Sequence, residues 1–401
     1  QVNEVGDHAV EYDGSEAADK SPQTVGRIYN GTFIGSGLNS ANTSSNGLRL
    51  RLDAAAQFWN CIWMDATDYM FRIEDTSLDR LAAGESAFAK NIVYNYGTYV
   101  RDNVQSVIDA FTAGGTDLDV DPDLGGISRM PNGMLDPRPN GTSPALTGAA
   151  IPSEDGVIRT VYRGAFDNEE NWALGWTALD AYGYFGDLAT PRESNAITIR
   201  DEDIEAGETL TLTANNEYLL EGFVYVEEGA TLIIEPGTVI KAIGVPATGD
   251  QTSALIIARG GKIIAEGTAD APIIFTSDLD DLTVTDDLTA LDNQTWGGII
   301  MLGKAPIGED VNPDLGYPTD VIEGIPSTEP RILYGGTDPN DNSGVLKYVS
   351  IRHGGSILGA DNEINGLTLG GVGAGTEIDY IEVFANKDDG IEIFGGTVTI
   401  Q

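Results

Sequence analysis

Residues 219–241 read LLEGFVYVEEGATLIIEPGTVIK, and residues 253–276 read SALIIARGGKIIAEGTADAPIIFT. Both stretches consist of short runs of β-branched and aliphatic residues that end at a Gly-centred turn and then start again. When Gly229 is aligned with Gly260, the two patterns coincide, and 230–232 matches 261–263. If the polar stretch 244–252 is set aside, the interval between the two patterns shortens to about 22 residues, a length that repeat architectures use.

A strand–turn period of this length, without helical spacing between the strands, is typical of a right-handed parallel β-helix. One coil of such a solenoid cannot bury its apolar face alone, so like residues must stack on like residues from coil to coil. The 50 glycines agree with this fold, because its corners need backbone conformations that Gly adopts at low cost. The sequence therefore predicts an all-β chain, a parallel β-helix in two stretches with an irregular insert between them.

Three segments are predicted along the chain. Residues 1–112 form the first β-helical stretch and end in a short helix at 102–112, whose apolar residues have helical spacing behind an Asp or Asn cap. Residues 113–194 are punctuated by Pro and Gly and form an irregular wrapping or linker segment, and residues 195–401 form the second β-helical stretch. Asparagines at the coil corners are expected to stack and to satisfy the corner backbone; they are Asn60, Asn91 and Asn95. The aromatic residues expected to pack as a plug are Trp172, Trp176, Tyr182, Tyr184 and Phe185.

The charge and composition of the chain limit which classes of molecule it is expected to bind. The chain has 63 acidic and 22 basic residues and a formal net charge of −41, so it repels nucleic acid phosphates and anionic membranes. We find no stretch of 18 apolar residues and therefore expect no membrane span. Cys61 is the single cysteine, which excludes an intrachain disulfide. The chain begins with Gln1 rather than Met, which favours a processed or excised product exposed outside the cell.

Several long motifs resemble a family of secreted β-helix proteins from Bacteroidetes and related bacteria. The motifs that carry the resemblance are YGGTDPNDNSGVLKYVSIRHGG, NEINGLTLGGVGAGTEIDYIEVFANKDDGIEIFGGTV, LGGISRMPNGMLDPRP and GAFDNEENWALGWTALDAYGYFGD. The resemblance covers nearly the whole chain and implies a right-handed parallel β-helix at the cell surface, exported by type IX secretion. It implies no catalytic residues.

The order of the segments departs from that family. In the family a segment similar to 195–400 comes first and one similar to 1–190 follows, whereas here the order is inverted. The chain is thus expected to start and finish within a solenoid, with bare coils near Arg27 and Ile400. Stacking of these coils between copies would be heterologous and would not close, so a head-to-tail filament is predicted.

One acidic run is a candidate metal site. Its four carboxylates alternate with apolar or Pro residues and lead into Gly125 and Gly126; they are Asp117, Asp119, Asp121 and Asp123. Alternate residues of an extended segment share one side, and several carboxylate oxygens are the ligands that Ca²⁺ prefers. The sequence predicts Ca²⁺ as a cofactor here; a solvated acidic loop is the alternative interpretation.

Two further acidic clusters invite a catalytic interpretation. Asp388, Asp389 and Glu392 form one, and the stretch 338–341 forms the other. β-Helix lyases of the pectate type bind their substrate through Ca²⁺ on such clusters and use Arg or Lys as the base, and Arg352 and Lys387 are the nearest basic residues. Paired carboxylates also suit a glycoside hydrolase. We favour corner solvation with Asx-turn hydrogen bonds, and we assign no catalytic residue.

The sequence thus favours an extracellular structural protein, the shaft of a cell-surface fibre or a head-to-tail filament, with Ca²⁺ as a stabilising ion. Its expected partners are copies of itself. A polysaccharide-binding or polysaccharide-cleaving β-helix is the alternative, with an extracellular polysaccharide as the partner. The scarcity of basic residues argues against a lyase, because the substrate of such an enzyme is itself anionic.

Overall fold

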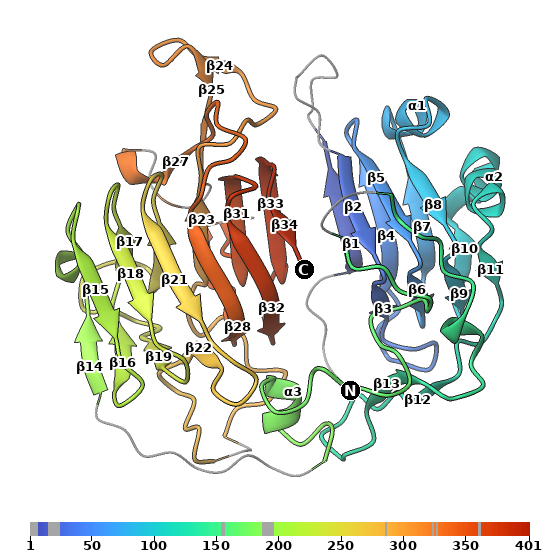
Figure 1. Ribbon diagram of the computed structural model, residues 1–401, viewed down its shortest axis with the longest axis horizontal. Helices are drawn as coiled ribbons and strands as arrows, with labels where there is room; N and C mark the ends of the chain where they lie inside the picture. The colour runs from blue at the N-terminus through green and yellow to red at the C-terminus, as the bar shows by residue number, and fades with distance from the viewer. Residues whose placement is uncertain are drawn as a thin grey trace. The chain divides into compact units, whose positions relative to one another are not determined.

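The computed structural model describes residues 7–14, 25–153, 157–186, 196–284, 287–322, 325, 328–359 and 362–401. The chain divides into two compact units, Gln1–Trp172 and Ala173–Gln401, which are described here one at a time. In both units short strands stack in parallel from coil to coil (Figure 1). The prediction of an all-β parallel β-helix is confirmed. The predicted segment boundary at 194/195 falls outside the described residues.

The strands of unit Ala173–Gln401 form three faces. The first face contains β15 (Thr209–Leu212), β18 (Thr231–Ile234), β21 (Lys262–Glu266), the first halves of β28 (Gly344–Arg352) and β32 (Glu377–Phe384), and β34 (Thr399–Ile400). The second contains β14 (Ala196–Ile199), β16 (Glu217–Leu220), β19 (Val239–Ala242), β22 (Ile273–Ser277) and the second halves of β28 and β32. The third contains β17 (Phe223–Val226), β20 (Ala254–Ile257), β23 (Ile299–Leu302), β31 (Leu367–Val372) and β33 (Ile391–Gly396).

Antiparallel hairpins and short helices lie outside the stacked parallel strands of this unit. The hairpins are β24 (Val311–Asn312) with β25 (Tyr317–Pro318), β26 (Asp320–Val321) with β27 (Leu333–Tyr334), and β29 (Ile357–Gly359) with β30 (Asn362–Glu363). The helices are α3 (Ala178–Ala181), η3 (Asp201–Asp203) and η4 (Pro330–Ile332).

The register confirms the repeat that the sequence predicts. Leu232 of β18 pairs with Leu210 of β15 on the coil before it and with Ile263 of β21 on the coil after it. Gly229 and Gly260, the aligned turn glycines, have φ of +83° and +86°, a conformation in which a Cβ would be strained. The polar excursion before β20 therefore adds residues without disturbing the stack.

Aliphatic ladders fill the interior of this unit. One ladder runs along the third face through Val226, Ile257, Met301, Leu369 and Ile393, each paired with the next. The first four of these side chains are fully buried in the central cluster. Burial of each large aliphatic side chain contributes roughly 1.5–3 kcal/mol, so the ladders are the main source of stability.

Unit Gln1–Trp172 is likewise a stack of parallel coils with three faces, and its strands are shorter. Its first face contains β1 (His8–Asp13), β4 (Asn46–Arg51), β7 (Tyr69–Ile73) and β10 (Thr98–Val100). The other faces contain β2 (Val25–Tyr29), β5 (Ala55–Trp59) and β8 (Ala87–Ala89), and β3 (Thr32–Ile34), β6 (Ile62–Met64), β9 (Ile92–Tyr94) and β11 (Asp117–Leu118). The hairpin β12 (Leu124–Gly126) with β13 (Asp136–Pro139) and the helices α1 (Ser77–Ala82), α2 (Gln105–Ala113), η1 (Arg101–Asn103) and η2 (Pro144–Leu146) complete it.

Asparagine side chains satisfy the corners of this unit, as predicted for Asn60 and Asn91. Asn60 Nδ2 donates to Asn30 Oδ1 of the preceding coil at 3.3 Å, and both residues have positive φ. Asn91 Oδ1 accepts from Cys61 N at 2.9 Å, while its Nδ2 donates to Phe58 O at 3.0 Å. Asn95 lies at another corner, where its Nδ2 donates to Asp65 Oδ1 at 2.5 Å.

Helix α2 seals one end of this unit. Phe111 is fully buried and stacks on Phe71 and on Phe88, with ring centroids 4.0 Å apart in both pairs. The helix begins later than predicted, at Gln105, and Val104 rather than Asp or Asn precedes it. The predicted cap was wrong because Asp102 takes a left-handed conformation, with φ of +57°, which short polar side chains tolerate.

We expect Phe111→Ala to lower the free energy of unfolding by about 3–5 kcal/mol, because it removes a ring from between two aromatic layers and leaves a cavity. Urea unfolding followed by tryptophan fluorescence measures this change. Ser106→Ala, on the exposed side of the same helix, is the control and should stay within about 0.5 kcal/mol of the wild type. Equal stabilities of the two variants would show that α2 does not seal the core.

Candidate functional site

The outer side of the second face of unit Ala173–Gln401 bears a cluster of polar side chains. Ser350 of β28 pairs in register with Glu382 of β32, and Arg352 lies two residues beyond Ser350. Arg352 Nε donates to Ser350 Oγ at 2.8 Å, and the Ser350 hydroxyl donates to Glu382 Oε2 at 2.5 Å. Coil stacking alone therefore brings an acid, a hydroxyl and a guanidinium together.

Helix α3 covers this cluster. The backbone amide of Ala178 donates to Glu382 Oε2 at 2.6 Å, so the carboxylate accepts from the first turn of the helix. Trp176 packs edge-on against Tyr348 and Tyr380, which stack on each other with centroids 4.2 Å apart. Burial raises the pKa of Glu382, against the opposing charge of Arg352. Of the residues expected to form an aromatic plug, Trp176, Tyr182 and Tyr184 are buried against the sheet, whereas Trp172 is 38% exposed and stacks on Phe166.

His353 continues the cluster beyond the end of β28. Its Nδ1 lies 2.5 Å from the carbonyl oxygen of Asp292, which can only accept, so Nδ1 carries the proton. Its Nε2 therefore accepts from the Tyr182 hydroxyl at 2.9 Å. Asp280 lies beside them and accepts from the Thr276 hydroxyl at 2.5 Å. Burial lowers the pKa of His353, so the imidazole is neutral at pH 7.

These residues have the types that acid–base catalysis uses, but most of them are shielded from solvent, and Glu382 is half-buried. His353 and Asp280 are fully buried, and Arg352 and Tyr182 are nearly so. General acids and bases must come within hydrogen-bond reach of a substrate. In this structure the cluster instead holds residues 173–184 against the outer side of the sheet. Because Arg352 is buried in it, this side chain is not available as the base that a lyase would need.

An open pocket of about 340 Å³ lies next to the buried cluster. Its lining consists of Glu217, Lys241 and residues 278–283. Lys241 Nζ lies 3.1 Å from Glu217 Oε2. Hydrogen bonds from Thr283 lower the pKa of Asp281, which stays charged at neutral pH. The pocket is therefore acidic, with one lysine that is already paired, and is suited to a neutral or cationic ligand.

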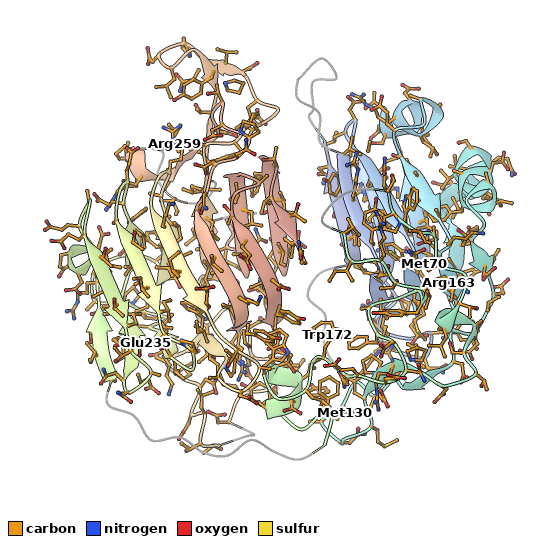
Figure 2. All side chains as sticks on the ribbon, in the orientation of Figure 1. Met70, Met130, Arg163, Trp172, Glu235 and Arg259 are labelled. Atoms are coloured by element: carbon orange, nitrogen blue, oxygen red, sulfur yellow. The ribbon has the colours of Figure 1, made fainter. Side chains whose placement is uncertain are left out.

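The four aspartates predicted to bind Ca²⁺ lie on β11 and in the segment that follows it. Each carboxylate accepts a hydrogen bond from a different group: Asp117 from Arg163 Nη1 (2.6 Å; Arg163 is labelled in Figure 2), Asp119 from the Tyr96 hydroxyl (2.7 Å), Asp121 from the backbone of Asp123 (2.8 Å), and Asp123 from Asn140 (2.9 Å). In the described part of the chain, none of them belongs to a group of three or more donor atoms within 4.8 Å of one another. Calcium binding at these residues stays a prediction.

The other acidic clusters lie at corners of the coils. Asp338 Oδ1 accepts from the backbone amide of Asn340 at 2.9 Å, which is the Asx-turn bond of the solvation hypothesis. Asp341 Oδ2 lies 3.4 Å from the Ser343 hydroxyl. Asp388 and Asp389 occupy the corner between β32 and β33. The geometry at 338–341 is that of turn stabilisation.

The comparison with known families agrees with this architecture. A family model described as a pectate-lyase like β-helix domain matches residues 204–401. This part of the chain is similar to such domains. No curated protein and no solved structure matches the chain. Among the described residues, no helix is both long enough and apolar enough to cross a bilayer. The match supports a parallel β-helix, and it is compatible with a structural role and with a polysaccharide-related one.

The buried His353 predicts a pH dependence of stability. Its pKa is lowered in the folded chain, so the unfolded chain binds the proton first, and stability is lost as pH falls below about 6.5. We expect this residue to contribute a slope of up to about 0.7 kcal/mol per pH unit near pH 6.5, which rises toward about 1.4 kcal/mol per pH unit at lower pH for as long as the folded chain keeps the imidazole neutral.

The measurement compares urea midpoints of the wild type and His353→Gln between pH 7.5 and pH 5. The variant is expected to be less stable at pH 7.5 but to lose less stability on acidification. His8 is the same in both proteins, so it cancels from the comparison. Parallel pH profiles would show that folding does not lower the pKa of His353.

Proposed function

We propose that the chain is an extracellular structural protein, the β-helix shaft of a cell-surface fibre that grows by head-to-tail stacking of copies. The observation that carries this proposal is the exposure of ladder residues on the last described coil. Ile393 pairs with Leu369, and Ile391 pairs with Leu367, both of which are fully buried. Ile391 and Ile393 nevertheless expose 37% and 44% of their surface.

The neighbouring face has the same property. Ile400 of β34 pairs with Ile378, which is buried in the central cluster, yet Ile400 is 37% exposed. These isoleucines thus continue the interior ladders at positions that no further described coil covers. Parallel strand edges also present backbone donors and acceptors that a further strand can pair with.

Unit Gln1–Trp172 offers a matching surface at its first coil. Val10 and Tyr12 of β1 pair with the buried Leu48 and Leu50, but they are themselves only partly buried. Phe33 of β3 is likewise partly buried and stacks on Trp63 with ring centroids 4.0 Å apart. The opposite end of this unit is sealed by α2, so its first coil is the side on which a further coil can stack.

In the proposed assembly, β33 and β34 of one copy stack on β1 to β3 of the next. The contact joins two different surfaces and does not close on itself, so it produces a filament. Fully burying an exposed Ile side chain contributes roughly 1.5–3 kcal/mol, and stacking would gain the part of this that belongs to the 37–44% of each of the three isoleucines that is still exposed, before the cost of association. The inverted segment order, relative to the secreted β-helix proteins of Bacteroidetes, fits such a permuted stack. Type IX export and surface location belong to the same proposal.

We expect the purified chain to form regular fibres in negative-stain micrographs, with mass that rises with concentration in sedimentation velocity. Ile393→Lys places a charge in the stacking surface and should leave only single particles. Val245→Lys, at a loop position that is 91% exposed, is the control and should assemble normally. Single particles from the wild type at all concentrations would overturn the proposal.

A polysaccharide-related role is the second candidate. The matching family, which is named for its likeness to pectate lyase, and the open pocket beside Lys241 favour it. Micrographs and sedimentation of the same purified protein distinguish the fibre from the polysaccharide-related role. Single particles that bind or shorten a polysaccharide, with loss of binding in Lys241→Ala, would favour this candidate over the filament.

Calcium is part of the proposal as a stabilising ion. In the described part of the chain, the donors that reach Asp119, Asp121 and Asp123 are neutral, so their negative charges are not compensated by a paired cation. A Ca²⁺ ion would supply that charge.

We therefore expect 1 mM Ca²⁺ to raise the melting temperature and EGTA, which binds Ca²⁺ far more tightly than Mg²⁺, to lower it again. The double variant Asp119→Asn/Asp121→Asn should lose this response, because two carboxylates are neutralised without a change in size. Asp136→Asn removes a carboxylate that is paired with Arg138, and it should keep the response. Identical melting curves with Ca²⁺ and with EGTA would remove Ca²⁺ from the proposal.

A further inference from the structure

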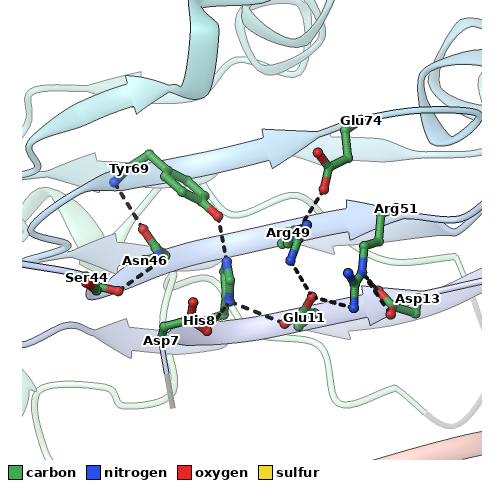
Figure 3. A network of polar contacts seen from close by, with 10 residues as sticks. All are labelled: Asp7, His8, Glu11, Asp13, Ser44, Asn46, Arg49, Arg51, Tyr69 and Glu74. Carbon is green, nitrogen blue, oxygen red and sulfur yellow. Dashed lines mark hydrogen bonds and ion pairs between the residues drawn. The ribbon is translucent and has the colours of Figure 1, made fainter. Parts of the chain in front are cut away.

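A second polar network surrounds the start of β1 in unit Gln1–Trp172 (Figure 3). Three potential metal ligands converge there, with one donor atom each from Asp7, His8 and Glu11 within 4.8 Å of one another. His8 Nδ1 lies 2.6 Å from Asp7 Oδ1 and 3.3 Å from Glu11 Oε2. Among the described residues, this is the group that places three such side chains together.

The imidazole of His8 is buried and points its Nδ1 into this group. Its side chain is only 5% exposed. No hydrogen bond of acceptable geometry reaches Nδ1 within the described residues, although two carboxylates lie close by. A buried nitrogen of this kind normally has a partner, because an unpaired polar atom loses the hydrogen bond that water would give it. Asp7 Oδ1, at 2.6 Å from Nδ1, must move back before an ion can lie among the three donors.

The other ring nitrogen fixes the tautomer that metal binding needs. His8 Nε2 lies 2.6 Å from the hydroxyl oxygen of Tyr69, a buried residue of β7. If Nε2–H donates to this oxygen, then Nδ1 carries a lone pair directed toward the carboxylates. Metal-binding histidines almost always donate their second N–H to an oxygen in this way.

Glu11 is held in place by arginines. Its Oε1 lies 3.0 Å from Arg49 Nη1 and 3.2 Å from Arg51 Nη2, which leaves Oε2 toward His8. Both guanidinium groups compensate the negative charge of this carboxylate. Figure 3 shows the Arg51 guanidinium on the side of Glu11 away from His8, and the Arg49 guanidinium between Glu11 and Glu74.

Asp7 is fastened through its backbone, while its side chain lies near the surface. Its carbonyl oxygen accepts from Asn46 N at 2.6 Å, which ties it to β4. The side chain is 61% exposed, so its carboxylate can move back from Nδ1 to admit an ion, and solvent can supply a fourth ligand. The separation of 3.3 Å between Nδ1 and Glu11 Oε2 equals the edge of a tetrahedron with bonds of about 2.0–2.1 Å.

We propose that Asp7, His8 and Glu11 bind one divalent transition-metal ion, of which Zn²⁺ is the best representative. One imidazole and two carboxylates suit Zn²⁺ and other divalent transition-metal ions, whereas Ca²⁺ takes six or more oxygen ligands. The alternative occupant is a proton on Nδ1, which would make His8 an imidazolium ion paired with both carboxylates. Metal binding would hold the start of β1 in this conformation and stabilise the fold by mass action.

The test uses the full chain, stripped of metal and titrated with Zn²⁺ at pH 7.5 by calorimetry. We expect one site per chain, at least tenfold weaker binding in His8→Gln and in Glu11→Gln, and at least tenfold weaker binding of Ca²⁺ by the wild type. Asp13→Asn lies on the same strand and removes a carboxylate that pairs with Arg51, so it serves as the matched control. It should bind Zn²⁺ as the wild type does.

A second measurement does not depend on the folding of the His8 and Glu11 variants. The chain has two histidines, so long-range ¹H–¹⁵N spectra of the wild type contain two imidazole systems, and His353→Gln assigns them. Zn²⁺ should shift the His8 nitrogens and leave Nε2 protonated. The proposal would be overturned if the chain did not bind Zn²⁺, or if the His8→Gln variant bound Zn²⁺ as tightly as the wild type does. It would also be overturned if the wild type bound Ca²⁺ with an affinity comparable to that for Zn²⁺, or if the spectrum of His8 remained that of an imidazolium ion in the presence of Zn²⁺.

Discussion

The stacking of like side chains from coil to coil is the interaction on which the rest of the structure depends. Leu232 lies between Leu210 and Ile263, and the same relation recurs along each face. Because each coil buries its apolar side only against its neighbours, no coil is stable alone. The hydrogen-bonded corners, the polar side chains on the outer surface and the exposed isoleucines of the last described coil are all consequences of this stacking.

The repeat could be predicted from the sequence because it is local and regular. Turn glycines and aliphatic runs revealed both the regular interval and the excursion that lengthens it once, and the apolar spacing around Val107 and Phe111 indicated α2. The start of α2 was missed because Asp102 stabilises a left-handed turn as readily as it caps a helix. Local preferences of this kind do not distinguish the two outcomes.

The polar clusters could not be predicted in the same way. Glu382 meets the backbone of Ala178, far away in sequence, and Tyr182 meets His353 from an equally distant segment. Only the fold brings such pairs together, and no signal in the acidic loop singles out Asp280. Asp7, His8 and Glu11 are close in sequence, but strand alternation alone would not place His8 and Glu11 together, since residues three apart point to opposite sides.

The regular interval between β15 and β18 has a consequence for how such a chain changes in length. Deleting or duplicating a whole coil would move the neighbouring coils by about 4.8 Å, the spacing of hydrogen-bonded strands, and leave every ladder in register. Losing a single residue within a strand would turn its aliphatic side chains outward. Such a solenoid can therefore be lengthened or shortened by whole coils, while a corner loop such as 244–252 can change in length without disturbing the stacked strands.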